Sequence, residues 1–243
     1  MRNMSRDDEL DDLSSAAVAR ARSGLYRLLA RIFRSEPDGN LLDEIGRPPL
    51  GPALAEAGVE TGTILPQRLE GEPVERLCEE FARLFLGPGK HVSPHESVQL
   101  KRGSGVLWGE ETAVVKRFIE AAGFDYDETY HGIPDHVSVE LEFLGHLSAR
   151  EADAIAAGET RTRLAVVDWQ HLFISRHVGR WVDEFSRRVA EQAEFPFYPA
   201  FARLVSRFLA TEKAHLARVQ TAIAARNPTA ATPNACSASP GPG

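Results

Sequence analysis

Histidine and acidic residues are the side chains in this sequence that could bind a metal ion. The chain has eight histidines and 35 acidic residues, and a Glu-x-x-His pair occurs at Glu128/His131 and at Glu212/His215. Di-iron helical bundles use two such pairs together with two further inward-facing glutamates. The first pair precedes Pro134 in a segment without helical periodicity, and HExxH is absent. We therefore interpret His131 and His215 as solvated surface residues and predict no metal site.

Residue patterns for other catalytic chemistry are also missing. The sequence contains no GxSxG nucleophile motif and no GxxxxGK[ST] phosphate loop. Ser97 follows Glu96, but no base can be assigned to it. His91 and His95 are four residues apart, but Pro94 lies between them, so this spacing does not place them on one helix face. We predict that the protein has no catalytic residues, binds no cofactor and is not an enzyme.

Charge, cysteine content and hydropathy restrict the class of protein. The formal charge of -7 argues against a nucleic-acid partner and favours a basic segment of another protein. The two cysteines, Cys78 and Cys236, occur without a CxxC motif and support neither a disulfide framework nor a zinc site. The acidic N-terminus is unlike a secretory signal, and no apolar run reaches the roughly 18 residues of a membrane span. The predicted location is the cytoplasm.

Helical periodicity dominates the middle of the chain. Apolar residues recur at helical spacing from Ser14 to Phe33 and from Val74 to Leu86. Further helices are predicted at 110–123, from Pro134 to about 157, at 160–193 and at 196–225. Residues 38–69 are expected to hold short helices, whereas residues 88–109 lack a period. The fourfold spacing of Phe173, His177, Trp181 and Phe185 predicts that they share one helix face.

The predicted fold is all-α, a single helical-bundle domain over residues 13–226. It has a smaller N-terminal helical part over about 13–108 and a C-terminal part over about 109–226. Residues 1–12 are predicted to be a disordered leader. Residues 227–243 are predicted to be a disordered tail, because Pro, Gly, Ser and Thr dominate and little can be buried.

Two interruptions of the helical pattern, at residues 81–100 and 131–147, each join a polar cluster to a helix end. Pro134 is expected to open a helix, since its missing N–H costs nothing at the first position. Asp135 and His136 would then lie in the first turn, with Glu140 one turn after His136. In the simplest interpretation Asp135 is a helix-start residue and His136 is a packed side chain hydrogen-bonded to it.

These two segments carry a resemblance to a known family. Leu84-Phe85-x-Gly87-Pro88, followed by Pro94-x-Glu96-Ser97-Val98, resembles the central motif of the TorD/DmsD/NarJ family of redox-enzyme maturation chaperones. Pro134-Asp135-His136, continuing through residues 140–144, resembles that family's second motif. The flanking patterns Arg22-x-x-Leu25-Tyr26, His177-x-x-x-Trp181 and Phe197-Tyr198-x-x-Phe201 are also similar. The resemblance spans about residues 14–212.

The resemblance implies an all-helical cytoplasmic chaperone. Such a protein binds the twin-arginine signal peptide and the apo form of a molybdopterin oxidoreductase subunit, and it supports cofactor insertion and proofreading before export. The family's peptide-binding positions correspond here to Tyr26, Leu84, Phe85, Pro88, Pro94, Glu96, Ser97, Asp135 and His136. The chain departs from the family at His95 and Gln99, where aromatic residues are common.

The physical hypothesis for binding adds Trp108 and Glu140 to these positions. We expect the apolar part of the peptide to dock in a groove lined by Tyr26, Leu84, Phe85 and Trp108. We expect Glu96, Asp135 and Glu140 to face its arginines. Each fully buried apolar side chain contributes about 1.5–3 kcal/mol, against about 0.2–1 kcal/mol for an exposed ion pair. Apolar contacts are therefore expected to set the affinity. A pKa of His136 near neutrality would let its charge respond to a partner.

Alternative functions remain at this stage. The client could be a nitrate-reductase-type subunit, served by a NarJ-like assembly chaperone. A metal-dependent helical enzyme would require convergent His and Glu ligands, and a generic helical scaffold would use both motifs only as caps and core. The family resemblance also implies that the protein is a monomer or a helix-swapped dimer. No nucleotide site is predicted.

Overall fold

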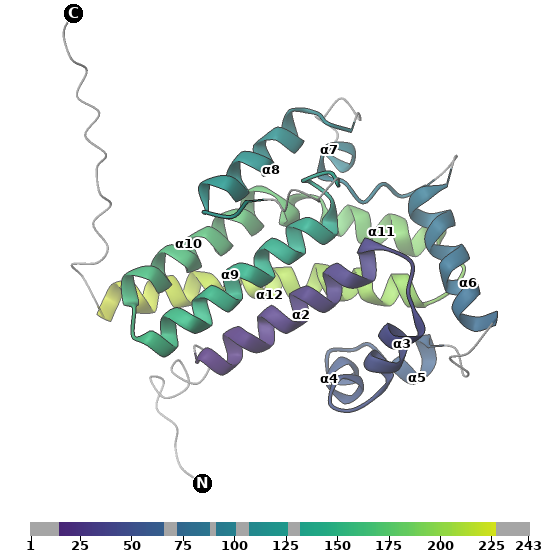
Figure 1. Cartoon of the computed structure of the whole chain (residues 1–243), viewed down its shortest axis with the longest axis horizontal. Coiled ribbons are helices and arrows are strands. Elements are labelled where there is room, and N and C mark those ends of the chain that lie inside the picture. The colour runs from purple at the N-terminus through teal and green to yellow at the C-terminus, as the bar shows by residue number, and fades with distance from the viewer. Residues whose placement is uncertain (1–14, 66–71, 88–90, 101–106, 126–131, 227–243) are drawn as a thin grey trace, which may run out of the picture.

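The structure is a computed structural model that describes residues 15–65, 72–87, 91–100, 107–125 and 132–226. Within these residues the chain forms helices and no β-strand, so the all-α prediction is confirmed (Figure 1). The predicted leader and tail lie outside the described residues, as do Pro88, Glu128 and His131. No helix of the described part is long and apolar enough to cross a membrane.

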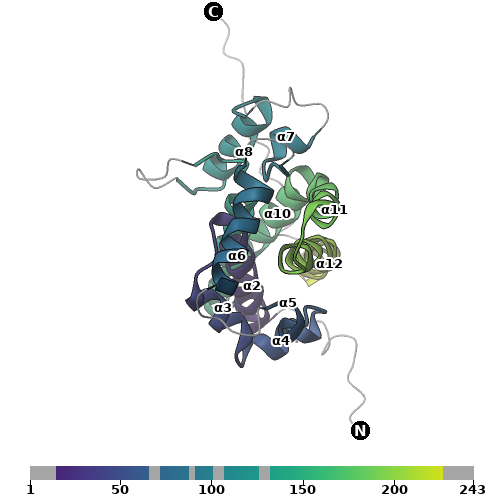
Figure 2. The ribbon, with the colours of Figure 1, turned by 90° about the vertical axis from the view of Figure 1, so that its right-hand side faces the viewer.

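Long helices form the body of the molecule. They are α2 (Ala16–Arg34), α9 (Val137–Ala157), α10 (Thr160–Arg176) and α12 (Phe197–Arg226). Helix α2 packs along α9, α9 along α10, and α10 along α12. Helix α11 (Val182–Gln192) packs on α12, and Figure 2 shows the two nearly end-on, with α10 beside them. The first long helix therefore belongs to the same bundle as the C-terminal helices.

Helix α2 illustrates how the sequence specifies these elements. The hydroxyl of Ser15 accepts a hydrogen bond from the N–H of Val18, at 3.3 Å, and caps the N-terminus. Tyr26, Leu29 and Phe33 recur at helical spacing and are fully or almost fully buried. The apolar face of α2 thus packs into the bundle.

Short helices fill the segment between α2 and the first motif. They are α3 (Gly39–Gly46), α4 (Leu50–Glu56) and α5 (Thr61–Ile64). They confirm the short helices predicted within residues 38–69, of which residues 66–69 lie outside the described part. Next, α6 (Glu72–Phe81) runs on into a π-helical turn, Ala82–Leu86, which ends at Gly87. Helices α3, α4 and α5 cluster beside one end of α2 and α6 lies near them (Figure 1).

The chain breaks where one helix was predicted over residues 160–193. Helix α10 ends at Arg176, a 3-10 turn covers Val178–Arg180, and α11 begins at Val182. A Cβ atom on Gly179 would lie 2.4 Å from the carbonyl oxygen of Ile174, so only glycine fits this turn. The prediction that Phe173, His177, Trp181 and Phe185 share one helix face is therefore wrong, although all four are buried.

A buried polar network connects the long helices. The Arg22 guanidinium donates to Glu212 Oε2 at 2.6 Å, to Glu151 Oε2 at 2.8 Å and to Gln170 Oε1 at 2.7 Å. The Tyr26 hydroxyl donates to Glu212 Oε2 at 3.2 Å. These contacts join α2, α9, α10 and α12, and all five side chains are buried. Pairing on this scale is what allows a charged guanidinium to lie inside a helical bundle.

His215 lies next to this network and is buried, so its interpretation as solvated surface is wrong. Burial lowers the pKa of His215 to about 4, with a further contribution from the positive charge of Arg22. Glu212, the other half of this Glu-x-x-His pair, is engaged by Arg22. In the described part of the chain, no group of three or more His, Cys, Asp or Glu side chains is arranged to hold a metal ion.

Candidate functional site

The two interrupted segments meet in space, as the sequence predicts. The backbone N–H of Glu96 donates to the carbonyl of Asp135 at 3.0 Å. This contact belongs to an isolated antiparallel bridge between His95 and His136, whose rings lie 4.9 Å apart. The first segment contributes the short helix α7 (Glu96–Gln99), which was not predicted. Both motifs therefore form one junction, from which α9 begins.

Asp135 is the polar centre of this junction and is fully buried. Its Oδ2 accepts from the backbone N–H of Ser97 at 2.8 Å, and its Oδ1 accepts from the Thr112 hydroxyl at 3.1 Å. Thr112 lies on α8 (Glu110–Ala121), so Asp135 joins α7, α8 and the start of α9. The expectation that Asp135 faces a ligand arginine is wrong, because these contacts hold its carboxylate inside the protein.

His136 is the N-cap of α9, so the prediction that Pro134 opens this helix is wrong. The ring Nδ1 of His136 accepts from the backbone N–H of Ser138 at 3.1 Å, which also differs from the expected bond to Asp135. Burial lowers the pKa of His136 to about 3, and the charges of His95 and Arg34 lower it further. The expected pKa near neutrality is wrong, and the imidazole stays uncharged between pH 6 and 8.

Glu140 lies one turn into α9 and is fully buried, so it does not face a ligand either. Its Oε2 accepts from the indole N–H of Trp181 at 3.3 Å. Its Oε1 has no hydrogen-bond partner among the described residues. Burial raises the pKa of Glu140 well above its usual value, and the nearby charge of Glu96 raises it further. The folded protein therefore holds the proton of the Glu140 carboxyl to a higher pH than an ordinary glutamate does.

Glu140→Gln is expected to change how stability depends on pH. The unfolded carboxyl ionises near its ordinary pKa of about 4.3, whereas the folded one keeps its proton to higher pH. The wild type therefore loses stability as pH rises above that value, by about 1.4 kcal/mol per pH unit, until the folded carboxyl ionises as well. Glutamine does not ionise, so the variant lacks this pH-dependent loss of stability. In urea unfolding measured from pH 5 to pH 8, the free energy of unfolding of the variant should therefore increase relative to that of the wild type.

The control for this measurement is Glu142→Gln, which changes a partly exposed carboxylate on the same helix. Its difference from the wild type should stay nearly constant over the same pH range. A constant difference for Glu140→Gln as well would show that Glu140 is ionised in the folded protein.

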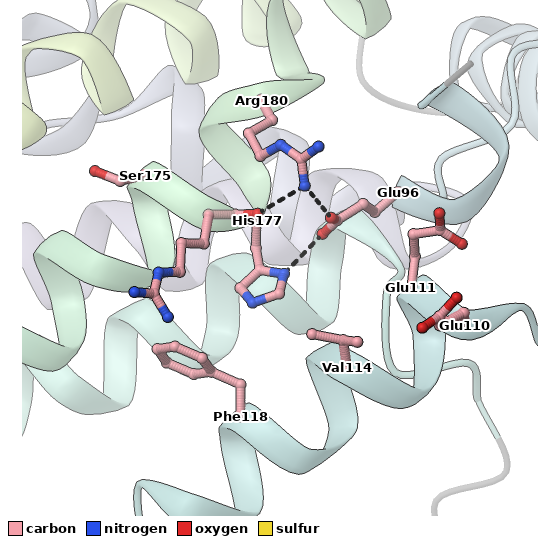
Figure 3. A pocket seen from close by; sticks show the side chains of 9 residues that line it. Glu96, Glu110, Glu111, Val114, Phe118, Ser175, His177 and Arg180 are labelled. Atoms are coloured by element: carbon pink, nitrogen blue, oxygen red, sulfur yellow. Dashed lines mark hydrogen bonds and ion pairs between the residues drawn. The ribbon is translucent and has the colours of Figure 1, made fainter. Parts of the chain in front are cut away.

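A cleft of about 480 Å³ opens beside the junction (Figure 3). We call it the Glu96 cleft; its lining residues are Glu96, Glu110, Glu111, Val114, Phe118, Ser175, Arg176, His177 and Arg180. Glu110 and Glu111 bring carboxylates from the first turn of α8. Arg176 and Arg180 bring guanidinium groups from the end of α10 and the 3-10 turn. The cleft is thus lined by the acidic N-terminus of α8 and by basic residues at the C-terminal end of α10.

Glu96 lines the cleft although its side chain is almost fully buried. Its Oε2 lies 3.2 Å from His177 Nδ1, and its Oε1 lies 3.8 Å from a guanidinium nitrogen of Arg180. Asp135 and Glu140 are absent from the cleft lining. Of the three acids predicted to face a ligand, Glu96 is the one that reaches this cleft.

The apolar residues expected to line a groove lie in the core. Tyr26 and Leu84 are completely buried, and Phe85 nearly so. The Phe85 ring contacts Phe33, Phe81, Phe185 and Tyr198, with centroid distances between 5.1 and 6.1 Å. Their predicted place in the groove is therefore wrong. Pro88, the other member of this motif segment, lies outside the described residues.

Trp108, in contrast, is exposed, with 65% of its surface accessible. Its backbone has a φ of 68°, a left-handed conformation that bulky residues rarely adopt. Leu107 and Val114 are also exposed, so apolar side chains surround the start of α8. Backbone strain of this kind is concentrated at ligand-binding and catalytic positions in proteins. Trp108 is the predicted apolar contact residue that solvent reaches.

The two positions where the chain departs from the family pattern are packed inside the junction. Gln99 is buried and donates from its side chain to the carbonyl of Ser93 at 2.6 Å. The Ser93 hydroxyl lies 3.2 Å from His95 Nδ1. Pro94 and Ser97, which lie close to His95 in the sequence, are buried as well. These residues shape the junction and present little surface to a partner.

Comparison with known proteins identifies the family. A family model described as "Nitrate reductase delta subunit" matches residues 48–187, more than half of the chain. The chain belongs to this family. The match covers both motif segments and the whole Glu96 cleft. The resemblance to TorD/DmsD/NarJ proteins stated from the sequence is thereby confirmed.

Similar proteins include members named as chaperones. "Chaperone protein TorD" of Vibrio vulnificus is 28% identical over 141 residues, which are 58% of this chain and 64% of that protein. "Chaperone protein TorD" of Shewanella pealeana is 25% identical over 203 residues, which are 77% of this chain and 86% of that protein. The crystal structure of a redox enzyme maturation protein from Archaeoglobus fulgidus has 27% identity and a TM-score of 0.46, covering 78% of this chain and 93% of that one.

Several cleft residues of this family member were not found from the sequence. Glu110 and Glu111 match the ordinary preference for acids in a first helical turn, so their types carry no separate signal. Arg176 and Arg180 enter the cleft because the chain turns at His177. The spacing of four residues from Phe173 to Phe185 predicted a continuous helix instead of this turn. The glycine at position 179 is the signal that could have revealed it.

Proposed function

We propose that this protein is a maturation chaperone for a molybdopterin oxidoreductase subunit. It binds the twin-arginine signal peptide and the apo form of its client, and it supports cofactor insertion and proofreading before export, in the cytoplasm. The observation that carries this proposal is the Glu96 cleft, which opens beside the junction of the two family motifs. Relatives that are named as chaperones support the same conclusion.

The chemistry of the cleft suits a peptide that combines arginine with apolar residues. Its volume of about 480 Å³ is in the range of ligand pockets, roughly 300–1,000 Å³. Glu96 and Glu111 would accept hydrogen bonds from a guanidinium group. Phe118 and Val114 line the cleft, and exposed Trp108 precedes α8, so the apolar residues of the peptide would pack on this helix.

The expected binding free energies differ between exposed ion pairs and the contacts made by Glu96 and Trp108. Exposed carboxylates such as Glu110 contribute about 0.2–1 kcal/mol per ion pair. A hydrogen bond to the charged and nearly buried Glu96 contributes about 1.5–3 kcal/mol. Covering Trp108 contributes a similar amount. Affinity is therefore expected to come from Glu96 and Trp108 together, while the outer acids orient the peptide and speed its association.

The test is calorimetric titration with a synthetic twin-arginine signal peptide. Trp108→Ala is expected to weaken binding at least about tenfold, because a large apolar contact is lost. Replacing both arginines of the peptide with lysines should also weaken binding, since an ammonium group cannot form the paired hydrogen bonds of guanidinium. Leu86→Ala is the matched control, because Leu86 is about as exposed as Trp108 but ends the π-helical turn after α6, whereas Trp108 precedes α8, which lines the cleft.

Two results would contradict the proposal. One is that the wild-type protein does not bind the peptide. The other is that Trp108→Ala and Leu86→Ala bind it equally well, which would place the peptide elsewhere on the surface. The fold of each variant is checked by its thermal unfolding.

A nitrate-reductase-type subunit is the second candidate client, favoured by the description of the matching family model. Co-purification with candidate apo subunits, with and without their signal peptides, separates the two clients. An apo subunit that co-purifies with the protein even without its signal peptide would indicate NarJ-like assembly. Elemental analysis of the purified protein tests the remaining alternative of a metal-dependent enzyme. Size-exclusion chromatography tests whether the protein is a monomer or a helix-swapped dimer.

A further inference from the structure

A guanidinium group of the protein itself already lies over the acid of the Glu96 cleft. Arg180 extends from the end of the 3-10 turn, and one of its terminal nitrogens lies 3.8 Å from Glu96 Oε1 (Figure 3). The same nitrogen donates to the backbone carbonyl of Arg176 at 3.2 Å. In the free protein, therefore, Arg180 lies where the proposed function would place an arginine of the client.

We infer that Arg180 is an internal competitor, which pairs with Glu96 in the free protein and is displaced when a client arginine enters. This inference rests on the proposed function and adds the regulation of its site. An internal competitor leaves the site free in only a fraction of the molecules. The apparent affinity for the peptide is the intrinsic affinity multiplied by that fraction. Arg180 would thus set a threshold that a weakly bound, wrong peptide does not pass.

The contact between Arg180 and Glu96 has the features of a displaceable pair. Its distance of 3.8 Å is about 1 Å longer than a strong charge-assisted hydrogen bond. The Arg180 side chain is 47% exposed, so water can solvate it when it leaves. A long ion pair with one solvated partner is weaker than a buried, hydrogen-bonded pair. His177 and Trp181, on either side of this turn, are buried and hold the backbone in place. Displacement of Arg180 therefore requires only its side chain to move.

The other contact of Glu96 is fixed, in contrast. His177 Nδ1 lies 3.2 Å from Glu96 Oε2, and both side chains are buried. Phe118 and Phe173 pack against the His177 ring, with centroid distances of 5.2 and 4.9 Å. One carboxylate oxygen is thus held by the core while the other faces the exchangeable guanidinium. This arrangement keeps the acceptor in place when Arg180 leaves.

Arg176 provides a matched comparison within the same cleft. It is also an exposed arginine of the lining, one turn before Arg180, but its side chain forms no ion pair with any described residue. Replacing either arginine with glutamine removes one positive charge from the same cleft. A general electrostatic effect would therefore be similar in Arg176→Gln and Arg180→Gln, whereas the release of Glu96 occurs only in the second.

The experiment measures the Kd of a labelled twin-arginine peptide by fluorescence polarisation for the wild type and both variants. We expect Arg180→Gln to bind about two- to fivefold more tightly than Arg176→Gln, the range that corresponds to an exposed pair. Arg180→Lys, which keeps a cation near Glu96, is expected to bind like the wild type. The gain in Arg180→Gln should be smaller for the twin-lysine peptide.

Equal affinities of Arg180→Gln and Arg176→Gln would overturn the inference, and so would weaker binding by Arg180→Gln. In both cases peptide binding by the wild type would leave the proposed function intact. If neither the wild type nor any variant binds the peptide, the proposed function and the inference fail together. Thermal unfolding of each variant confirms that affinities are compared between folded proteins.

Discussion

Replacing Arg22 with methionine is expected to lower the free energy of unfolding by about 3–5 kcal/mol. Methionine keeps the length of the side chain but removes all the hydrogen bonds that Arg22 donates to Glu212, Glu151 and Gln170. Two buried carboxylates then lose their main cation, and buried charges without a partner are costly. The loss is a large part of the roughly 5–15 kcal/mol that stabilises a typical domain. Urea unfolding followed by circular dichroism measures it.

Arg20→Met is the matched control for this prediction. Arg20 lies on the same helix and pairs with Asp153 at 3.3 Å, but both side chains are mostly exposed. Its loss should cost less than about 1 kcal/mol. If the two substitutions have similar effects, the network around Arg22 does not stabilise the bundle.

Phe85→Ala is likewise expected to lower the free energy of unfolding by about 3–5 kcal/mol. The ring is buried among Phe33, Phe81, Phe185 and Tyr198, so its removal leaves a cavity that these rings fill only in part. A Phe85 side chain in a peptide groove, as predicted from the sequence, would instead affect mainly peptide binding when truncated. Chemical unfolding and peptide titration of the same variant therefore separate the two roles.

Leu86→Ala controls for a general effect of shortening apolar residues in this segment. Leu86 is the next residue along the chain and is 67% exposed. Its truncation should change the free energy of unfolding by no more than about 0.5 kcal/mol. A stable Phe85→Ala protein with lost peptide binding would restore the original groove model.

The helical elements and the meeting of the two motif segments could be predicted from the sequence. Apolar spacing identifies α2 and α6 because a helix buries one face. The meeting of the Pro94 and Pro134 segments follows from the hypothesis that Glu96, Asp135 and Glu140 face the same ligand. The short helix α7 within that junction has only four residues, too few to show a period.

The orientation of the acidic side chains could not be predicted in the same way. Glu140 and Asp135 were expected to face the arginines of a bound peptide, since glutamate and aspartate are usually exposed. Both are buried, because Trp181, Ser97 and Thr112 supply donors from distant parts of the chain. Such long-range partners leave no local pattern in a single sequence. The same reason explains why the competition between Arg180 and a client arginine emerges only from the three-dimensional arrangement.

The Arg22 network also has a consequence for the order in which the protein is made. Arg22 and Glu212 are 190 positions apart, so the cation leaves the ribosome long before its partner. A nascent chain that lacks α12 has Glu151 and Gln170 as partners for Arg22 but not Glu212, so the buried network is incomplete until the last helix is made. Closure of the network between such distant positions is slow compared with local helix formation. We therefore expect a translation product truncated before α12 to be more sensitive to proteases than the full-length chain.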